Sequence, residues 1–343
     1  MKTEIKKPSY EVLCEAAELI KKGEVVAIPT ETVYGLAANA YDSDACAKIF
    51  TAKGRPQDNP LIIHICDLDM LRESVREIPP LALTLAEHFW SGSLTMIFPK
   101  KDIVPDTTSG GLDTVAVRMP DNQDTLNLIK MCGVPLAAPS ANLSGSPSPT
   151  RAKDVIADME GRIDAIISGD DCRVGIESTV VDMTGDVPTI LRPGIITAEA
   201  LEAAIGKKVK YDESLKEESK HVQLDPAAGV SESDFQPKSP GMKYKHYAPK
   251  ADMIVIEGER SRVKAEIERL KKLNESIGNN VGVLLFEEQA FIEAAHDFFA
   301  KLRDLDAQGV DLILAGALSD TDGVGFAVMN RMLKSAGYNI ARV

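Results

Sequence analysis

The sequence predicts an α/β protein with two domains, and three observations lead to that prediction. Short apolar runs rich in β-branched residues alternate with amphipathic helical runs over residues 1–209. The same alternation restarts at residue 251 and continues to residue 343. Between them, residues 210–250 are polar and charged and lack a regular apolar period. We therefore expect a first domain at 1–209, an interdomain linker at 210–250 and a second domain at 251–343.

The first domain begins with a predicted helix followed by a buried strand. Residues 10–22 repeat apolar side chains on one helical face, and Gly23 suits the end of that helix. The apolar run at 24–30 ends at Pro29 and indicates a strand, after which 44–54 forms a second helical pattern. Further strands are expected at 59–65, 93–100, 114–120, 134–142, 163–169 and 178–183. Helical patterns lie between several of these runs, so the domain belongs to the α/β class.

The second domain shows a regular βαβαβα pattern. Strands are expected at 252–258, 280–286 and 310–318. Helices are expected at 262–276, 291–309 and 323–337. This alternation predicts a small open sheet that is Rossmann-like in outline.

Composition and charge narrow the class of protein. The chain is 44% hydrophobic and 27% charged, which is ordinary for a soluble globular protein. Its net charge of −13, without a long run of Lys and Arg, does not suggest a protein that grips nucleic acid mainly through phosphates. The N-terminus lacks the apolar segment of a secretory signal, and no apolar run approaches the ~20 residues of a spanning helix. We therefore expect a cytoplasmic protein.

The five cysteines are scattered and include no C-x-x-C pair. This pattern argues against a zinc finger of ordinary spacing and against a disulfide framework. We expect each of them to behave as a small buried apolar residue. No set of metal ligands is identified from the sequence.

Two cations in one tight turn are the first candidate for ligand chemistry. Lys53 and Arg55 flank Gly54 in "TAKGRP", and a point charge beside a planar guanidinium suits a polyphosphate. The spacing is not that of a Walker A loop, and a solvated turn is the usual explanation of such a triplet. His64 follows among apolar residues, where a histidine is more often a satisfied core residue.

Polar residues at the ends of predicted strands form the other candidates. Thr32 lies in "PTETVYGL" just after a strand, where α/β folds place ligands, although a capped loop explains it equally well. Arg118 interrupts an apolar strand, so its guanidinium should meet a carboxylate from the protein or from a ligand. Ser178 heads a strand in "GIESTVVDM", and Arg192 ends one in "ILRPG".

A loop of small residues, "AAPSANLSGSPSPT" at 137–150, is the last candidate. Four serines and no bulky polar group would let a flat ligand or a phosphate approach the backbone closely. A flexible surface loop is the alternative explanation. No Ser-His-Asp order, H-E-x-x-H motif or catalytic-cysteine pattern stands out.

Taken together and in order, these motifs resemble one family. The stretches are "PTETVYGL", "KGRPQDNPLIIHI", "VAVRMP", "APSANLSG", "IESTVVD" and "LRPG". They closely resemble the threonylcarbamoyl-AMP synthases, the YrdC family, over residues 10–205. The stretches "SPGMKYKHYAP" and "GVGFAVMNRMLKSA" resemble the linker and second domain of the family's longer, two-domain branch. The resemblance implies a YrdC-like twisted mixed sheet with a deep concave face, plus the small Rossmann-like domain.

The resemblance also implies a reaction. Members of the family join L-threonine, bicarbonate and ATP to give threonylcarbamoyl-AMP and pyrophosphate, with magnesium accompanying ATP. A tRNA threonylcarbamoyl transferase then receives the product for an adenosine beside the anticodon. Direct tRNA binding is compatible with the family but not required by it.

The motif match assigns residues to these roles. Lys53 and Arg55 would be catalytic, because fixed cations stabilise charge on phosphoryl oxygens. The ATP site would contain Lys53, Arg55, Asn59, Thr114, Ser140, Ser148, Arg192, Tyr244 and Tyr247. The threonine site would contain Thr32, His64, Arg118, Ala138 and Ser178. In this assignment no side chain acts as a covalent nucleophile.

The segment "SPGMKYKHYAP" at 239–249 would then be a lid. A carbamate and an adenylate both hydrolyse readily, so a cover that excludes water is useful. Tyr244, His246 and Tyr247 could close the cleft, with Pro240 and Gly241 setting the turn. The alternative is that the tyrosines anchor the start of the second domain.

Two other functions remain open at this point. The same fold could serve as an RNA-binding module without catalysis, although the net charge of −13 weighs against it. A carbamoyl-transfer enzyme is the other, but those relatives are much longer and carry zinc modules, whereas this chain lacks cysteine pairs.

Overall fold

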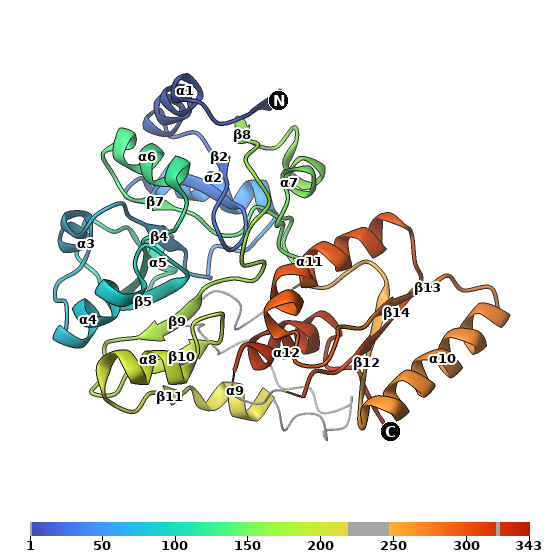
Figure 1. The fold of residues 1–343 in the computed structure, drawn as a ribbon. Coiled ribbons are helices and arrows are strands. Elements are labelled where there is room, and N and C mark those ends of the chain that lie inside the picture. The colour runs from blue at the N-terminus through green and yellow to red at the C-terminus, as the bar shows by residue number, and fades with distance from the viewer. Residues whose placement is uncertain (1, 219–246, 320–322) are drawn as a thin grey trace.

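The structure is a computed structural model that describes residues 2–218, 247–319 and 323–343, and these form two sheets with their helices (Figure 1). The first sheet has eleven strands in the order β1-β8-β2-β3-β7-β4-β6-β5-β9-β10-β11. The strands are β1 Glu4–Lys6, β2 Val26–Ile28, β3 Gly35–Asn39, β4 Ile62–His64, β5 Leu94–Pro99, β6 Thr114–Arg118, β7 Leu136–Ala137, β8 Ala165–Ile167, β9 Thr179–Asp182, β10 Thr189–Arg192 and β11 Lys210–Tyr211. The sheet contains parallel pairs, such as β4 with β6, and antiparallel pairs, such as β5 with β6, so it is mixed, as expected.

Nine helices accompany this sheet in the described part of the chain. They are α1 Tyr10–Lys21, α2 Ser43–Lys53, α3 Leu68–Ser74, α4 Pro80–Phe89, α5 Asp106–Ser109, α6 Gln123–Cys132, α7 Ala152–Met159, α8 Ala198–Ile205 and α9 Glu213–Glu218. Helix α2 begins where Asp42 accepts hydrogen bonds from two backbone N–H groups. It ends at Gly54, which adopts the left-handed conformation with φ of 62°. This local ending fixes where Lys53 and Arg55 emerge.

The second sheet has four parallel strands in the order β13-β14-β12-β15. They are β12 Asp252–Glu257, β13 Val281–Leu284, β14 Leu312–Gly316 and β15 Ile340–Arg342. Helices α10 Arg260–Ser276, α11 Phe291–Ala307 and α12 Val324–Ser335 connect them. The predicted α/β fold with a second, small parallel sheet is confirmed.

Several short strands escaped the sequence analysis, and the predicted linker begins with ordered structure. Strand β11 pairs in parallel with β10, and Leu215 of α9 is buried in the first core. The ring of Tyr211 meets Phe326 edge-on, with ring centroids 5.5 Å apart. Main-chain pairing at a sheet edge needs no long apolar period, so a two-residue strand leaves little trace in the sequence. The boundaries of linker and domains otherwise stay a prediction.

The second domain packs on the first through α11, which lies beside α7 (Figure 1). One apolar cluster joins Val33 and Ile176 of the first domain to Phe298 and Phe299 of α11. Gly175 has φ of 86°, and a Cβ atom there would lie 2.2 Å from a backbone oxygen of α11. The two parts of the chain therefore approach backbone to backbone at this point.

Charged side chains form a second set of contacts between the domains. Arg151 of the first domain pairs with Asp304 of α11 at 2.8 Å. In the opposite direction, Arg303 of α11 pairs with Asp158 at 2.7 Å and donates to the backbone oxygen of Pro147. The loop that contains Pro147 is thus attached to the second domain.

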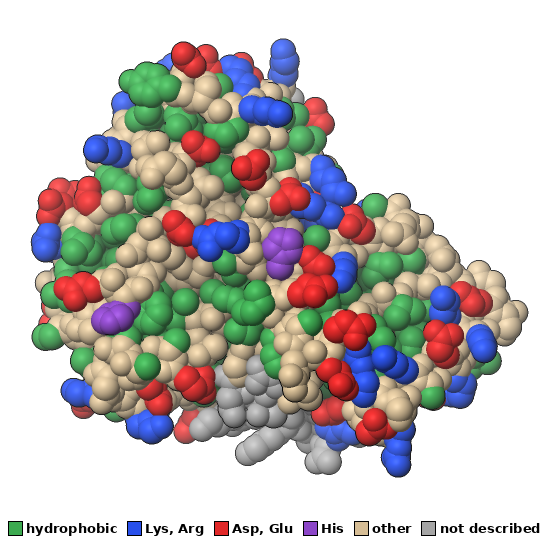
Figure 2. Space-filling model, viewed as in Figure 1, with side chains coloured by type: hydrophobic (Ala, Val, Ile, Leu, Met, Phe, Trp, Pro, Cys, Tyr) green, Lys and Arg blue, Asp and Glu red, His purple; other side chains and the backbone are tan. Residues whose placement is uncertain are grey.

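The surface shows positive and negative side chains interspersed on the face of Figure 2. In the described part of the chain, none of the helices has the length and hydropathy of a membrane span. Of the cysteines, Cys46, Cys132 and Cys172 are buried as expected, whereas Cys14 and Cys66 are half-buried.

Candidate active site

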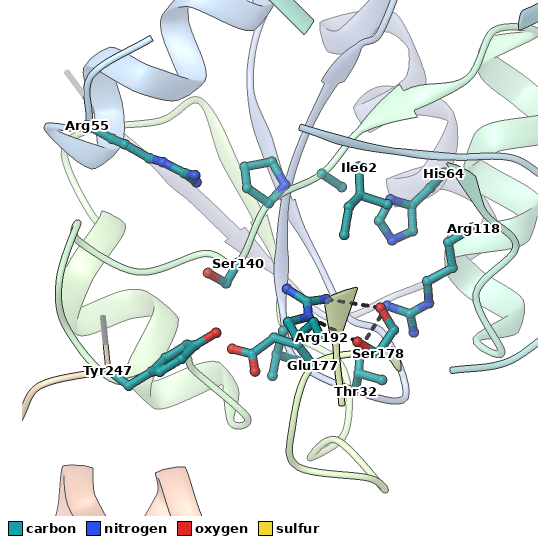
Figure 3. Close-up of a pocket in the computed structure, with 13 residues that line it drawn as sticks. Thr32, Arg55, Ile62, His64, Arg118, Ser140, Glu177, Ser178, Arg192 and Tyr247 are labelled. Atoms are coloured by element: carbon teal, nitrogen blue, oxygen red, sulfur yellow. Dashed lines mark hydrogen bonds between the residues drawn. The ribbon is translucent and has the colours of Figure 1, made fainter. Parts of the chain in front are cut away.

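A cavity on the first sheet brings most of the predicted site residues together (Figure 3). Its wall is contributed by strand ends, by the 29–34 and 138–140 loops and by Tyr247 near the end of the predicted linker. The lining residues are Thr32, Val33, Arg55, Ile62, His64, Arg118, Ala138, Pro139, Ser140, Glu177, Ser178, Arg192 and Tyr247. Three guanidinium groups and three hydroxyl-bearing residues other than tyrosine therefore face one space, which suits an anionic ligand.

The register of two parallel strands places His64 beside Arg118. Strand β4 pairs with β6 so that Ile62 lies opposite Ala116 and His64 opposite Arg118. Side chains two residues apart share a face of a strand, so Ile62, His64 and Arg118 all face the cavity. Both polar residues end their strands at the carboxyl edge, where α/β folds bind ligands.

Arg118 has a carboxylate partner within the protein. Its Nη2 lies 2.6 Å from Oε2 of Glu31, and both side chains are buried. Nη1 donates to Oγ1 of Thr32 at 2.9 Å, and Nε donates to the backbone oxygen of Gly92 at 3.1 Å. The partner that the sequence required is thus Glu31, and a ligand carboxylate would be an additional one.

Glu31 is itself held by three donors. Besides Arg118, it accepts from Oγ of Ser93 at 3.0 Å and from the backbone N–H of Asp121 at 3.1 Å. Burial opposes its ionisation, but the charge and hydrogen bond of Arg118 outweigh burial and hold the pKa of Glu31 below its ordinary value. The carboxylate therefore orients Arg118 toward the cavity.

Ser178 and Arg192 meet where β9 begins and β10 ends. Nε of Arg192 donates to the backbone oxygen of Ser178 at 3.1 Å, and Nη2 donates to its Oγ at 3.2 Å. The same Oγ lies 2.7 Å from Oγ1 of Thr95 on the neighbouring strand. Burial lowers the pKa of Arg192, although a guanidinium remains charged. This places a fixed cation beside a hydroxyl in the cavity wall.

His64 is neutral in this environment. Burial, with the charge of Arg118 adding to it, lowers its pKa from 6.5 to about 3. Its Nδ1 has no hydrogen-bond partner among the described residues. A buried ring nitrogen without a partner, on a histidine that lines a cavity, is suited to a ligand hydrogen bond, which the core-histidine alternative does not explain.

Tyr247, near the end of the predicted linker, lines the cavity, as Figure 3 shows. Its ring lies 5.2 Å from that of Phe299, so it also packs in the core of that domain. Burial, with the charge of Glu177 adding to it, raises the pKa of the phenol to about 12. Tyr247 thus packs against the second domain and lines the cavity at the same time, and the lid function of 239–249 stays a prediction. Tyr244, His246, Pro240 and Gly241 lie outside the described residues.

Four predicted ATP-site residues do not line this cavity. Lys53 is buried, and its ammonium donates to backbone oxygens of the 140–142 loop. Ser148 donates to Oε1 of Glu177 at 2.5 Å, behind the wall. Asn59 is fully buried, with no hydrogen-bond partner for its amide among the described residues. Thr114 is half-buried at the opposite end of β6 from Arg118. The donors of Lys53 thus meet the loop, and its contact with a phosphate stays a prediction.

Two charged residues in or behind the wall were missed by the sequence analysis. Glu177 lines the cavity, and Nε of Arg331 on α12 lies 3.2 Å from its Oε2. Burial raises the pKa of Glu177, but the charges of Arg331 and Arg192 outweigh it, so the pKa is lowered. Arg331 interrupts the buried face that includes Ala327 and Ser335, and a charge on such a face was the available signal.

Comparison with protein families supports the same reading over both parts of the chain. The Sua5–YciO–YrdC family, described as telomere recombination, matches residues 18–194. The family described as threonylcarbamoyl-AMP synthase, C-terminal domain, matches residues 196–337. Together they cover both sheets.

Individual relatives are similar over nearly the whole chain. A threonylcarbamoyl-AMP synthase of Pyrococcus abyssi is 45% identical, covering 96% of this chain and 95% of its own. One from Bacillus subtilis is 43% identical, covering 96% and 94%. The crystal structure of P. abyssi Sua5 complexed with L-threonine superposes with a TM-score of 0.89 at 43% identity, covering 100% of this chain and 99% of that one. This chain belongs to the threonylcarbamoyl-AMP synthase family, in its two-domain form.

Proposed function

We propose that this chain is an L-threonylcarbamoyladenylate synthase, which converts L-threonine, CO2 or bicarbonate, and ATP to threonylcarbamoyl-AMP and pyrophosphate. The observation that carries the proposal is the grouping of Arg55, Arg118 and Arg192 around one cavity with the Thr32, Ser140 and Ser178 hydroxyls. The name of the P. abyssi and B. subtilis relatives and the threonine in the P. abyssi structure support it.

The chemistry makes two successive bonds. The threonine amine adds to CO2 and loses a proton, which gives a carbamate. A carbamate oxygen then attacks the α-phosphorus of ATP, the bond to the β-phosphate oxygen breaks, and pyrophosphate leaves. This is an adenylyl transfer, so the enzyme would be a nucleotidyltransferase.

The residues of the cavity divide between the two substrates. Arg118, fixed by Glu31, would meet the threonine carboxylate, while Thr32, His64, Ala138 and Ser178, which line the same cavity, would surround the amino acid. Arg55 and Arg192 would hold the phosphates, with Ser140 and Tyr247 nearby. Charge accumulates on phosphoryl oxygens during transfer, so cations fixed in advance by hydrogen bonds stabilise it without reorganising.

The cavity does not suit a magnesium ion held by the protein alone. Its nearby carboxylates, Glu31 and Glu177, are each paired with a buried arginine. In the described ranges, no group of three or more His, Cys, Asp or Glu side chains could hold a metal. We propose that magnesium enters on the phosphates of ATP, as part of the substrate.

The product would pass to a tRNA threonylcarbamoyl transferase. Adenylates of this kind hydrolyse readily, so direct transfer is chemically useful. A cytoplasmic location would match that hand-off, and a direct tRNA contact is not needed for it.

The test is pyrophosphate release from labelled ATP. Release should require both threonine and bicarbonate, and release without either one would refute the proposal. Arg55→Ala should reduce the rate about 100-fold or more, because a fixed positive charge on the phosphates is lost. Arg72→Ala, which removes an exposed surface arginine of α3, is the matched control and should leave the rate unchanged. A non-catalytic RNA-binding module would release no pyrophosphate, and a carbamoyl-transfer enzyme would not depend on threonine.

A further inference from the structure

The ammonium of Lys53 is enclosed by the loop that forms one wall of the cavity. Lys53 is the last residue of α2, and 3% of its surface is exposed. Its Nζ donates to the backbone oxygens of Ser140 and Asn142, the latter at 2.9 Å. The side-chain Oδ1 of Asn142 lies 3.5 Å away as a third acceptor. An ammonium has three N–H groups, so the acceptors match its donors in number.

The loop also closes around the backbone of the same residue. The N–H of Ser144 donates to the backbone oxygen of Lys53 at 2.9 Å. The amide Nδ2 of Asn142 donates to the backbone oxygens of Leu143 and Ser146, at 2.8 and 2.9 Å. These two bonds fix the orientation of the amide, with its oxygen toward Lys53. The loop from 140 to 146 is therefore folded around a single lysine.

In this arrangement the N–H groups of Lys53 are used by the loop, so few remain for a ligand. Ala138, Pro139 and Ser140 line the cavity. Arg55, two residues after Lys53 in the sequence, lines it as well. A phosphate that bound Lys53 would have to displace the carbonyl oxygen of Ser140 or of Asn142. The displaced oxygen would then lose its hydrogen-bond donor. The wall residues, in contrast, depend on the loop for their position.

We propose that Lys53 is a positioning residue, which holds the 138–146 loop against α2 so that Ala138 and Ser140 face the cavity, and that it is not a phosphate ligand. The identity of the ligands, ATP and threonine, rests on the proposed function, whereas the contacts between Lys53 and the loop are independent of it. The proposal replaces the direct catalytic role that the sequence suggested for Lys53. Arg55 keeps the role of the phosphate-binding cation in the same turn.

The first test needs no ligand. In Lys53→Met, hydrogen–deuterium exchange of the backbone amides in 138–146 should become at least about tenfold faster than in the wild type, because the loop loses its central donor. Lys48→Met is the matched control, since it removes an exposed cation of the same helix, paired with Glu24, and should leave exchange in this loop unchanged. Unchanged exchange in Lys53→Met would overturn the proposal.

The second test separates positioning from phosphate binding by calorimetry with each ligand alone. Lys53→Met should weaken L-threonine and magnesium–ATP alike, by at least about tenfold, because both contact the same loop. Arg55→Met should weaken ATP and spare threonine. Loss of ATP affinity in Lys53→Met with unchanged threonine affinity would show a phosphate ligand and refute the proposal.

A second variant keeps the question decidable if Lys53→Met does not fold. Lys53→Arg retains the positive charge but replaces the compact ammonium with a planar fork. It should show the same faster exchange and no rescue of ATP binding, whereas wild-type exchange and ATP affinity would refute the positioning role. If the wild type bound neither ligand, the proposed function would fail, and the exchange measurement would still decide the role of Lys53.

Discussion

The buried ion pair between Arg331 and Glu177 should make a large and mutually dependent contribution to stability. Arg331 is fully buried on α12 and connects the second domain to the wall of the cavity. It also donates to the backbone oxygen of Pro193 at 2.5 Å. The perturbation is Arg331→Met, which keeps an unbranched side chain but removes all of these donors.

The structure sets the expected size of the effect. Removing one partner of a buried pair costs about 3–5 kcal/mol, because the other charge stays buried without compensation. Glu177 would keep the hydrogen bond from Ser148 and the nearby charge of Arg192, so the lower end applies. We expect Arg331→Met to lower the free energy of unfolding by about 3 kcal/mol, and Glu177→Gln to do the same.

The assay is a double-mutant cycle in urea, followed by circular dichroism. The double variant should lose about 3 kcal/mol rather than the sum of about 6, because neither charge is then left alone. Arg342→Met is the control, since its pair with Glu257 is half exposed and should contribute at most about 1 kcal/mol. Additive losses, or a loss below about 1 kcal/mol in Arg331→Met, would refute the reasoning.

Three further predictions follow from burial and backbone geometry. The pKa values of Glu31 and Glu177 are lowered in the folded state, so the two carboxylates stabilise the fold fully above about pH 4.5 and progressively less as the pH falls below it. The melting temperature should therefore fall between pH 6 and pH 3, and it should fall less in the variant with Gln at both positions. His64 has a pKa of about 3 and stays neutral from pH 5 to 8, so His64→Asn should lower the rate of pyrophosphate release without changing its pH dependence in that range. A change of rate near pH 6.5 in the wild type that the variant lacks would contradict this. Gly175→Ala should destabilise the protein by about 2 kcal/mol or more, because a Cβ would collide with the backbone of α11. Gly133→Ala lies at a similar positive φ of 71° but has open space around it, so it should cost about 1 kcal/mol, and equal losses in the two variants would exclude the collision.

The helices and strands were predictable because the spacing of apolar side chains among neighbouring residues differs between the two. The predicted helix at 44–54 is α2, and the predicted strand at 114–120 contains β6. The same reasoning required a partner for Arg118, because a guanidinium in an apolar strand is costly alone. It failed for β11, where two residues pair at a sheet edge, and for Arg331, whose burial depends on contact with the other domain.

The identities of the partners were decided only by the tertiary structure. Glu31 and Arg118 are far apart in the sequence, and a motif cannot show that they meet at 2.6 Å. Lys53 illustrates the same limit, because its residue type and its turn favour a phosphate, while the loop around 140–146 takes up its donors. The sequence by itself determined the α/β class, the order of the elements and which side chains carry charge at the site. Whether a given charge faces a ligand or another part of the protein depends on distances between remote segments, and those distances exist only in the folded chain.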